Sequence, residues 1–204
     1  MHRLLFLCLL LITSFAQAQS LSDLRSFGQP STTRLYLFTA PGCPSCAVFH
    51  KTIFPDLIKQ YANTNRAEIL MVDIPRDETE LSAVTLLRCL PSEKAERFST
   101  WLYQNQSKWL GVSGALDIFQ RYLLSIGITL SDFQKCTKDQ ELRDTIIEQR
   151  NNLQSLYNIS GTPTIALRQG DRAKLYTGIN KHLILKTLEE DILAVEKNAK
   201  KRKK

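Results

Sequence analysis

The chain has 204 residues, of which 43% are hydrophobic, with 8 glycines and 7 prolines. This composition is typical of a globular protein and excludes a disordered, collagen-like or low-complexity chain. The formal net charge is +7, but six positive charges lie in the tail 197–204 and a seventh is Arg3. The body between residues 19 and 196 is therefore formally neutral, which argues against nucleic-acid binding.

Residues 1–18 have the pattern of a cleaved signal peptide. An apolar run at 4–15 precedes Ala16-Gln17-Ala18, whose small side chains are typical of a cleavage site. The run is shorter than the roughly 20 residues that span a bilayer, so we expect export to the periplasm without a membrane anchor. Cys8 lies inside the run and would be lost with the signal peptide.

Four cysteines remain after cleavage, and in an oxidising compartment an even number indicates disulfide chemistry. Cys43 and Cys46 form a Cys-x-x-Cys motif. Of the three possible pairings, the spacing favours the one that joins these two, leaving Cys89 with Cys136.

The first elements predict a βαβ unit. Residues 33–39 are rich in apolar and aromatic side chains, as expected for a strand buried on both faces. Apolar residues then recur at helical spacing over 44–58, with a bend predicted at Pro55. Residues 69–74 predict a second buried strand, which should lie parallel to the first.

The middle of the chain, 77–157, contains no convincing strand and several apolar stripes of helical spacing. Four-residue patterns that begin at Ser131 and Thr137 fit the capping box of helix starts. Strand periodicity returns at 164–167 and 174–176, which predicts a hairpin. The apolar stripe of a last helix follows, formed by Leu183, Leu185, Leu188, Ile192 and Val195.

This order predicts one α/β sheet domain interrupted by a helical subdomain. We expect its basic C-terminal tail to be a solvated, mobile end, with contact to an anionic surface as the alternative. The predicted parts are a signal peptide (1–18), the first part of the sheet domain (19–76), a helical insertion (77–157), the second part of the sheet domain (158–196) and the tail (197–204).

The segment Cys43-Pro44-Ser45-Cys46 lies where the first strand leads into a helix. A thiol at a helix N-terminus faces unpaired backbone N–H groups and the positive end of the macrodipole, which stabilise its thiolate. Thiol–disulfide exchange requires that thiolate, and a second thiol one turn away can resolve the mixed disulfide. We therefore expect Cys43 to attack and be attacked, and Cys46 to resolve.

Two other interpretations of the motif are an inert structural disulfide and half of a zinc site. No second Cys-x-x-Cys or close Cys-His pair completes a zinc site in the sequence, so we expect no metal and no cofactor. His50, two turns along the helix, is interpreted as a packing or surface residue.

A second motif is Gly161-Thr162-Pro163-Thr164. A proline at the start of a strand suits a cis bond, which turns the chain and leaves the backbone groups of the preceding residue free. A trans proline that opens the strand is the alternative.

Taken together, the motifs resemble the thioredoxin superfamily, and more closely the periplasmic DsbA-like thiol oxidoreductases. This resemblance implies a thioredoxin fold, in which a central mixed sheet flanked by helices carries an inserted all-helical subdomain. It rests on residues 38–46, Phe49-His50, Phe54-Pro55, Arg88-Cys89, 98–106, Trp109, 133–136 and 159–164.

The resemblance also implies roles for particular residues. It implies a cis bond before Pro163, with the Thr162 backbone pairing to an extended substrate segment. It implies that Cys89 and Cys136 form a second, structural disulfide in the helical block; two unpaired buried cysteines are the alternative.

The chain departs from the DsbA-like pattern at two places near the motif. Relatives carry a buried acid six positions before the first active-site cysteine, whereas Leu37 stands there in this chain. The dipeptide Pro44-Ser45 lacks the histidine of the strongest oxidants, so we expect a milder oxidant whose Cys43 thiol is still acidic. The short segment before Cys43 leaves no room for the N-terminal dimerisation domain of the family's isomerases, so we expect a monomer.

The expected function is that of an exported thiol:disulfide oxidoreductase that donates the Cys43–Cys46 disulfide to reduced or misfolded exported proteins. The resemblance implies reoxidation by a quinone-linked membrane partner of the DsbB type. One alternative is a reductase or isomerase of the same fold, kept reduced by a membrane electron donor. Another is a non-catalytic exported binding or chaperone module.

Overall fold

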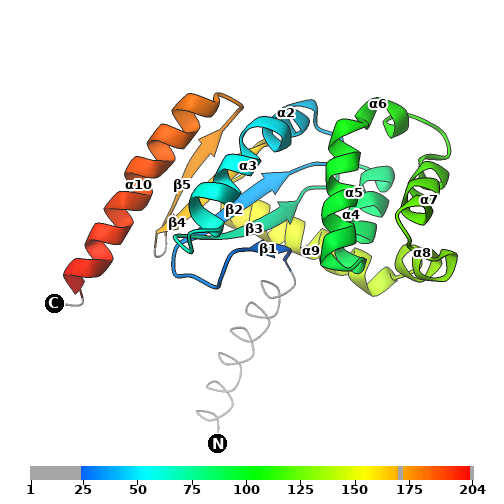
Figure 1. The fold of residues 1–204 in the computed structure, drawn as a ribbon, viewed down its shortest axis with the longest axis horizontal. Helices are drawn as coiled ribbons and strands as arrows, with labels where there is room; N and C mark the ends of the chain where they lie inside the picture. Colours follow the sequence, from blue (N-terminus) through cyan, green and yellow to red (C-terminus); the bar gives the residue numbers. More distant parts are fainter. Residues whose placement is uncertain (1–23, 170–171, 203–204) are drawn as a thin grey trace, which may run out of the picture.

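The computed structural model describes residues 24–169 and 172–202, so the predicted signal peptide, Cys8 and the tip of the predicted hairpin lie outside the described residues. One sheet has the strand order β1-β3-β2-β4-β5 (Figure 1). Its strands are β1 (Ser26–Phe27), β2 (Arg34–Thr39), β3 (Glu68–Asp73), β4 (Thr164–Gln169) and β5 (Arg172–Thr177).

The β2–β3 pair is parallel, whereas β1–β3, β2–β4 and β4–β5 are antiparallel. The predicted parallel pair and the predicted hairpin are therefore confirmed. The edge strand β1 was not predicted, because two residues are too few to show an alternating pattern.

Helices surround the sheet, and six of the described ones lie between β3 and β4 in the chain, as the predicted helical insertion requires. In chain order the helices are α2 (Pro44–Thr52), α3 (Phe54–Leu57), the π-helix η1 (Ile58–Ala62), α4 (Glu78–Cys89), α5 (Ser92–Gln104), α6 (Gln106–Trp109), α7 (Ala115–Ser125), α8 (Leu130–Thr137), α9 (Gln140–Leu156) and α10 (Lys181–Arg202).

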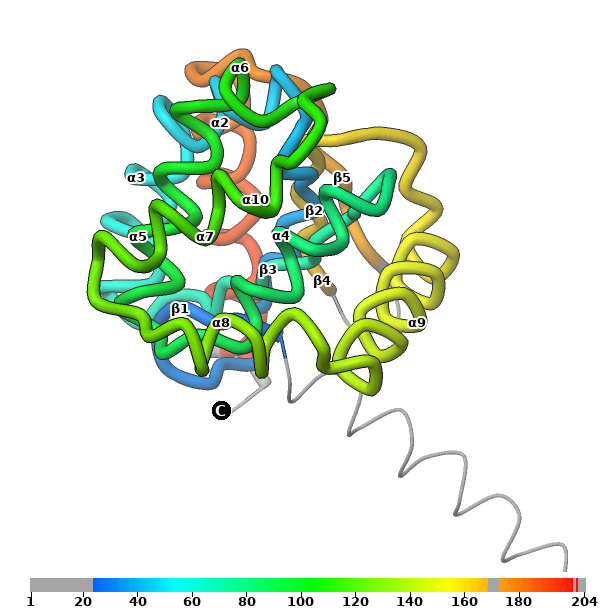
Figure 2. The backbone as a smooth tube through the Cα atoms, turned by 90° about the vertical axis from the view of Figure 1, so that its right-hand side faces the viewer, coloured from blue at the N-terminus to red at the C-terminus, as the bar shows by residue number. Residues whose placement is uncertain are grey.

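Both faces of the sheet are buried, which explains why β2 and β3 have nearly continuous apolar sequences. Leu35 and Leu37 pack in one core with residues of α2, α3, η1 and α10. Tyr36 and Phe38 point to the other face and pack with residues of α9. Figure 2 shows α9 on one side of the sheet and α2 and α3 on the other.

The helical block has a core of its own, which includes the fully buried Trp109, Phe98 and Phe119. Cys89 at the end of α4 and Cys136 in α8 are joined by a disulfide with their Cα atoms 5.6 Å apart. The bond links two helices of this block, and Cys136 packs in its core.

Both predicted capping boxes are wrong by two residues. The N-cap of α8 is Thr129, whose hydroxyl accepts from the Asp132 N–H at 3.1 Å. The N-cap of α9 is Asp139, which accepts from the Leu142 N–H at 2.9 Å. Neither true cap has the Glu or Gln three residues later that defines a capping box, so the pattern search passed over them.

The last helix differs from its prediction at both ends. Ile184, Leu188 and Ile192 pack against the sheet, whereas Leu183, predicted in the apolar stripe, is 55% exposed. Residues of the basic tail continue α10 as far as Arg202. Lysine, arginine and alanine all have high helix propensity, and cations at a helix C-terminus complement its dipole. Among the described helices, none combines the length and the apolar character needed to cross a membrane.

Candidate active site

Cys43 is the N-cap of α2, immediately after the turn that follows β2. Its Sγ accepts a hydrogen bond from the Cys46 N–H at 3.4 Å, and its carbonyl oxygen accepts from the Ala47 N–H at 3.1 Å. Pro44 occupies the first turn, where a missing N–H costs no helix hydrogen bond. The sulfur of Cys43 therefore lies at the positive end of α2.

The two thiols differ in their surroundings. Cys46 is fully buried, and its Sγ accepts from the Ala40 N–H at 3.5 Å. Cys43 keeps 8% of its surface exposed, and the two residues that follow it, Pro44 and Ser45, are exposed as well. Cys43 is thus the sulfur that another molecule can reach.

The Thr162–Pro163 peptide bond is cis, and it lies directly before β4. The carbonyl oxygen of Thr162 is 3.4 Å from Cys43 Sγ. Residues that are 119 positions apart in the chain thereby meet, because β4 lies beside β2 in the sheet.

The pKa values of the two thiols move in opposite directions. Burial raises the pKa of Cys43, but hydrogen bonds with the side chains of Thr162 and Cys46 and from the Cys46 and Ser45 N–H groups outweigh it, so the pKa falls below its usual 9.0. Burial raises the pKa of Cys46 to about 12. The reduced pair therefore combines one acidic thiol with one that stays protonated at neutral pH.

Gln106, at the start of α6, holds the active-site loop from the side of the helical block. Its Nε2 donates to the carbonyl oxygens of Pro41 at 2.7 Å and Cys43 at 2.9 Å. Figure 1 shows the loop between β2 and α2 beside α6. The sequence carried no local signal for this contact, because it joins segments far apart in the chain.

An ion pair with a buried carboxylate lies on another side of the same loop. The side chain of Glu80 in α4 is fully buried, and its Oε1 accepts from the Nε of Arg76 at 3.0 Å. A Cβ on Gly42 would lie 2.2 Å from that carboxylate oxygen, so the pair touches the backbone directly before Cys43. The two residues are four positions apart, but Arg76 precedes α4, so helical spacing gave no signal for this pair in the sequence.

Leu37, six positions before Cys43, is fully buried in the core on the α2 face. The acid on this face of the sheet is Asp73, which lies opposite Thr39 at the end of the neighbouring strand β3. Asp73 pairs with Arg25 at 3.2 Å, and the hydroxyl of Tyr103 donates to Thr39 Oγ1 at 3.2 Å.

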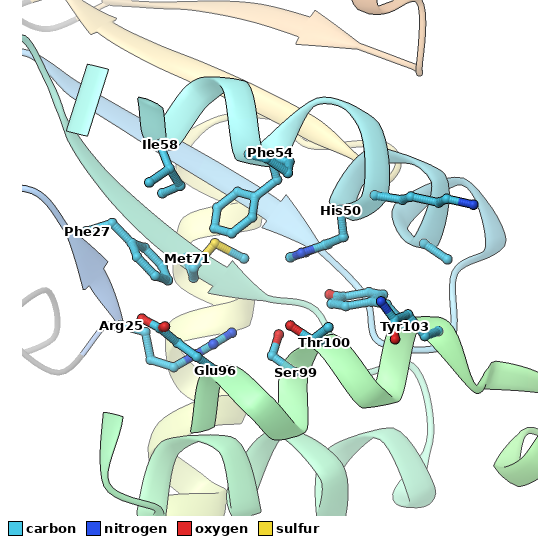
Figure 3. Close-up of a pocket in the computed structure, with 14 residues that line it drawn as sticks. Arg25, Phe27, His50, Phe54, Ile58, Met71, Glu96, Ser99, Thr100 and Tyr103 are labelled. Carbon is cyan, nitrogen blue, oxygen red and sulfur yellow. The ribbon is translucent and has the colours of Figure 1, made fainter. Parts of the chain in front are cut away.

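His50 lies in a contact between α2 and α5. Its ring stacks on Tyr103 with the centroids 3.8 Å apart, and Figure 3 shows the two rings side by side. They border a cavity of about 410 Å³ between α2, α3 and α5, which Arg25 and Met71 also line. Burial, and to a smaller extent the charge of Arg25, lowers the pKa of His50 to about 3. His50 therefore packs as a neutral ring.

Replacing His50 with phenylalanine is expected to make the protein's stability less sensitive to acid. An unfolded histidine takes up a proton near pH 6.5 but the folded one only near pH 3, so the wild type loses stability as the pH falls between these values. The wild type should lose about 1.4 kcal/mol more per pH unit than His50→Phe between pH 6 and pH 4. Urea unfolding at each pH measures this difference, and equal slopes would contradict the low pKa.

The structure brings together four of the predicted site residues, Cys43, Cys46, Thr162 and Pro163, with Pro44 and Ser45 exposed beside them. Cys89 and Cys136 lie in the helical block, outside this cluster. Sequence patterns missed Gln106 and the Arg76–Glu80 pair, which contact the loop from α6 and α4.

Two curated bacterial proteins, both provisionally named protein-disulfide oxidoreductases, are similar in sequence. The one from Rickettsia felis is 26% identical over 128 residues, which are 62% of this chain and 46% of the relative. The one from Rickettsia bellii is 29% identical over 132 residues, or 62% of this chain and 49% of the relative. The match thus spans about half the length of these relatives.

Solved structures share the fold. Alpha-DsbA1 of Wolbachia pipientis superimposes with a TM-score of 0.74 at 19% identity, over 88% of this chain and 94% of that one. BdbD of Bacillus subtilis gives a TM-score of 0.67 at 18% identity, over 84% and 94% of the two chains. A protein-disulfide isomerase of Novosphingobium aromaticivorans gives a TM-score of 0.68 at 18% identity, over 81% of this chain and 96% of that one.

The predicted thioredoxin fold with its helical insertion is therefore confirmed by the sheet order and by these DsbA-like neighbours. The sequence profile of the family described as Thioredoxin matches residues 23–177, which include both halves of the candidate site. The chain belongs to this thioredoxin family.

Proposed function

We infer that this protein is a thiol:disulfide oxidoreductase that introduces disulfides into other proteins through Cys43 and Cys46. A client thiolate attacks Cys43 Sγ of the oxidised enzyme, the Cys43–Cys46 bond breaks, and Cys46 leaves and takes up a proton. A second client thiolate then attacks the client sulfur of the mixed disulfide and expels Cys43 as a thiolate. The client loses two electrons and two protons, and the enzyme is reduced.

The observation that carries this proposal is the placement of Cys43 Sγ at the N-terminus of α2, 3.4 Å from the Thr162 carbonyl oxygen. Helix N–H groups stabilise a thiolate at this position. The neighbouring backbone of Thr162 precedes β4, where an extended client segment can add main-chain hydrogen bonds.

Oxidation of the client is the favoured direction. A low pKa makes Cys43 a good leaving group and stabilises the reduced enzyme, so its disulfide accepts electrons readily. The reverse direction, reduction of a client disulfide, requires Cys46 to attack a mixed disulfide. Its pKa of about 12 leaves little thiolate for that step at neutral pH.

The partners proposed with this activity are reduced or misfolded exported proteins and a membrane protein of the DsbB type that reoxidises the enzyme. The predicted signal peptide supports a periplasmic location. The names of the similar proteins include DsbA and protein-disulfide oxidoreductases, which supports the oxidoreductase activity.

The test is the refolding of a reduced disulfide-containing client in the presence of the oxidised enzyme. The wild type should accelerate disulfide formation, and Cys43→Ser should leave only the uncatalysed rate. Equal rates would identify a binding or chaperone module. The equilibrium with glutathione separates the directions, because an oxidase favours its reduced form and a reductase its oxidised form.

A further inference from the structure

The active-site loop has a charged pair against the residue before Cys43. A Cβ on Gly42 would lie 2.2 Å from Glu80 Oε1 and 2.7 Å from Arg76 Nη2. Both distances are shorter than a normal nonbonded contact, so a larger residue at position 42 would displace the pair. The pair therefore lies against the residue that directly precedes Cys43.

The two members of the pair differ in burial. The Glu80 side chain is fully buried, and its second carboxylate oxygen accepts from the Arg76 backbone N–H at 3.1 Å. The Arg76 side chain is 49% exposed. Glu80 is itself fixed at the start of α4, because its N–H donates to the Asp77 side chain at 2.8 Å. The carboxylate thus anchors the guanidinium at the edge of the site.

We propose that Arg76 is a positioning residue of this site, whose guanidinium, held by Glu80, stabilises the Cys43 thiolate across Gly42. The consequence of this inference for catalysis rests on the proposed function. The cation favours the negatively charged sulfur and the carboxylate opposes it, so the two charges are expected to move the Cys43 pKa in opposite directions. Hydrogen bonds to Glu80 raise the Arg76 pKa most, burial opposes them, and the charge of Cys43 raises it further.

The expected consequence is a more acidic Cys43 and a more oxidising disulfide. A thiolate held by a cation stabilises the reduced enzyme, and each unit by which the Cys43 pKa falls favours reduction of the disulfide about tenfold. The same cation also makes Cys43 a better leaving group when the second client thiolate attacks.

The test is the pH dependence of the alkylation of Cys43 by iodoacetamide in the reduced full-length protein. Arg76→Met is expected to raise the Cys43 pKa by about one unit, because it removes the cation and leaves a buried carboxylate. Glu80→Gln is expected to lower the pKa, because the amide still accepts from Arg76 but no longer opposes it. Arg76→Lys should restore most of the wild-type value.

Shifts of the Cys43 pKa in opposite directions in Arg76→Met and Glu80→Gln would exclude a merely structural role. A loosened loop would move the pKa in the same direction in Arg76→Met and Glu80→Gln, and that result, or no shift in either, would overturn the proposal. Glu80→Gln and Arg76→Lys keep hydrogen-bonding groups in place, so these two variants still test the proposal if Arg76→Met does not fold. The matched control is Arg66→Met, which removes an arginine paired with Glu189 and Glu196 and should leave the Cys43 pKa unchanged.

The titration needs no client protein, so its outcome is independent of the refolding assay. If the wild type fails to oxidise clients while the two variants shift the Cys43 pKa in opposite directions, the function is wrong and the role of Arg76 stands. If the wild type oxidises clients and neither variant shifts the Cys43 pKa, the function stands and the role of Arg76 is wrong.

Discussion

A Cys46→Ser variant is expected to lose disulfide transfer entirely and to accumulate mixed disulfides through Cys43. Without Cys46 the enzyme has no disulfide to donate, yet Cys43 keeps its place at the N-terminus of α2 and its contact with Thr162. A client disulfide attacked by Cys43 then stays attached, because the buried resolving sulfur is missing. Incubation with a disulfide-containing client, followed by non-reducing electrophoresis, measures the trapped species.

The control for this experiment is the double variant Cys89→Ser/Cys136→Ser, which removes the cysteines of the helical block and should still transfer disulfides. Cys43→Ser/Cys46→Ser should trap nothing. The assignment of Cys43 as the reactive sulfur would be wrong if Cys46→Ser still catalysed disulfide transfer, or if it formed no mixed disulfide with an accessible client.

Removal of the disulfide between α4 and α8 is expected to have the largest effect on stability. The bond closes a loop of sequence separation 47, and the chain-entropy relation gives about 4 kcal/mol for a loop of this length. The variant Cys89→Ala/Cys136→Ala should lose up to this amount in the free energy of unfolding, measured by denaturation in urea.

The same variant should keep the low pKa of Cys43, because Cys89 and Cys136 lie in the separate core of the helical block. Stability and thiol chemistry are therefore expected to separate. A loss of less than 1 kcal/mol would contradict the stabilising role of the bond, and a shifted Cys43 pKa would reveal coupling between the two cysteine pairs.

The elements that sequence patterns predicted well have strong local signals. β2 and β3 are buried on both faces, so their residues form apolar runs, and Cys43 and Pro44 stand where a strand ends and a helix begins. The predictions failed where the deciding contact is weak or distant. β1 has two residues, and the caps Thr129 and Asp139 lack the capping-box partner.

The surroundings of the thiols illustrate the same limit. The sequence shows an apolar residue, Leu37, six positions before Cys43. It could not show that an acid on the neighbouring strand, Asp73, lies on the same face of the sheet. Gln106 and Glu80 reach the active-site loop only because α6 and α4 fold against it. Such contacts depend on strand order and helix packing, which no local pattern records.

For this protein the sequence alone placed two thiols at a strand–helix junction, because a Cys-x-x-Cys motif follows a buried strand and opens a helical pattern. It also determined the fold class, through the alternation of buried strands and helical stripes. Only the tertiary structure decided what surrounds those thiols: the distance of 3.4 Å between Cys43 and Thr162, the buried state of Cys46, and the charged pair behind Gly42. The reason is physical, since the reactivity of a thiol follows from its pKa, and a pKa is set by burial and by charges that distant segments bring together.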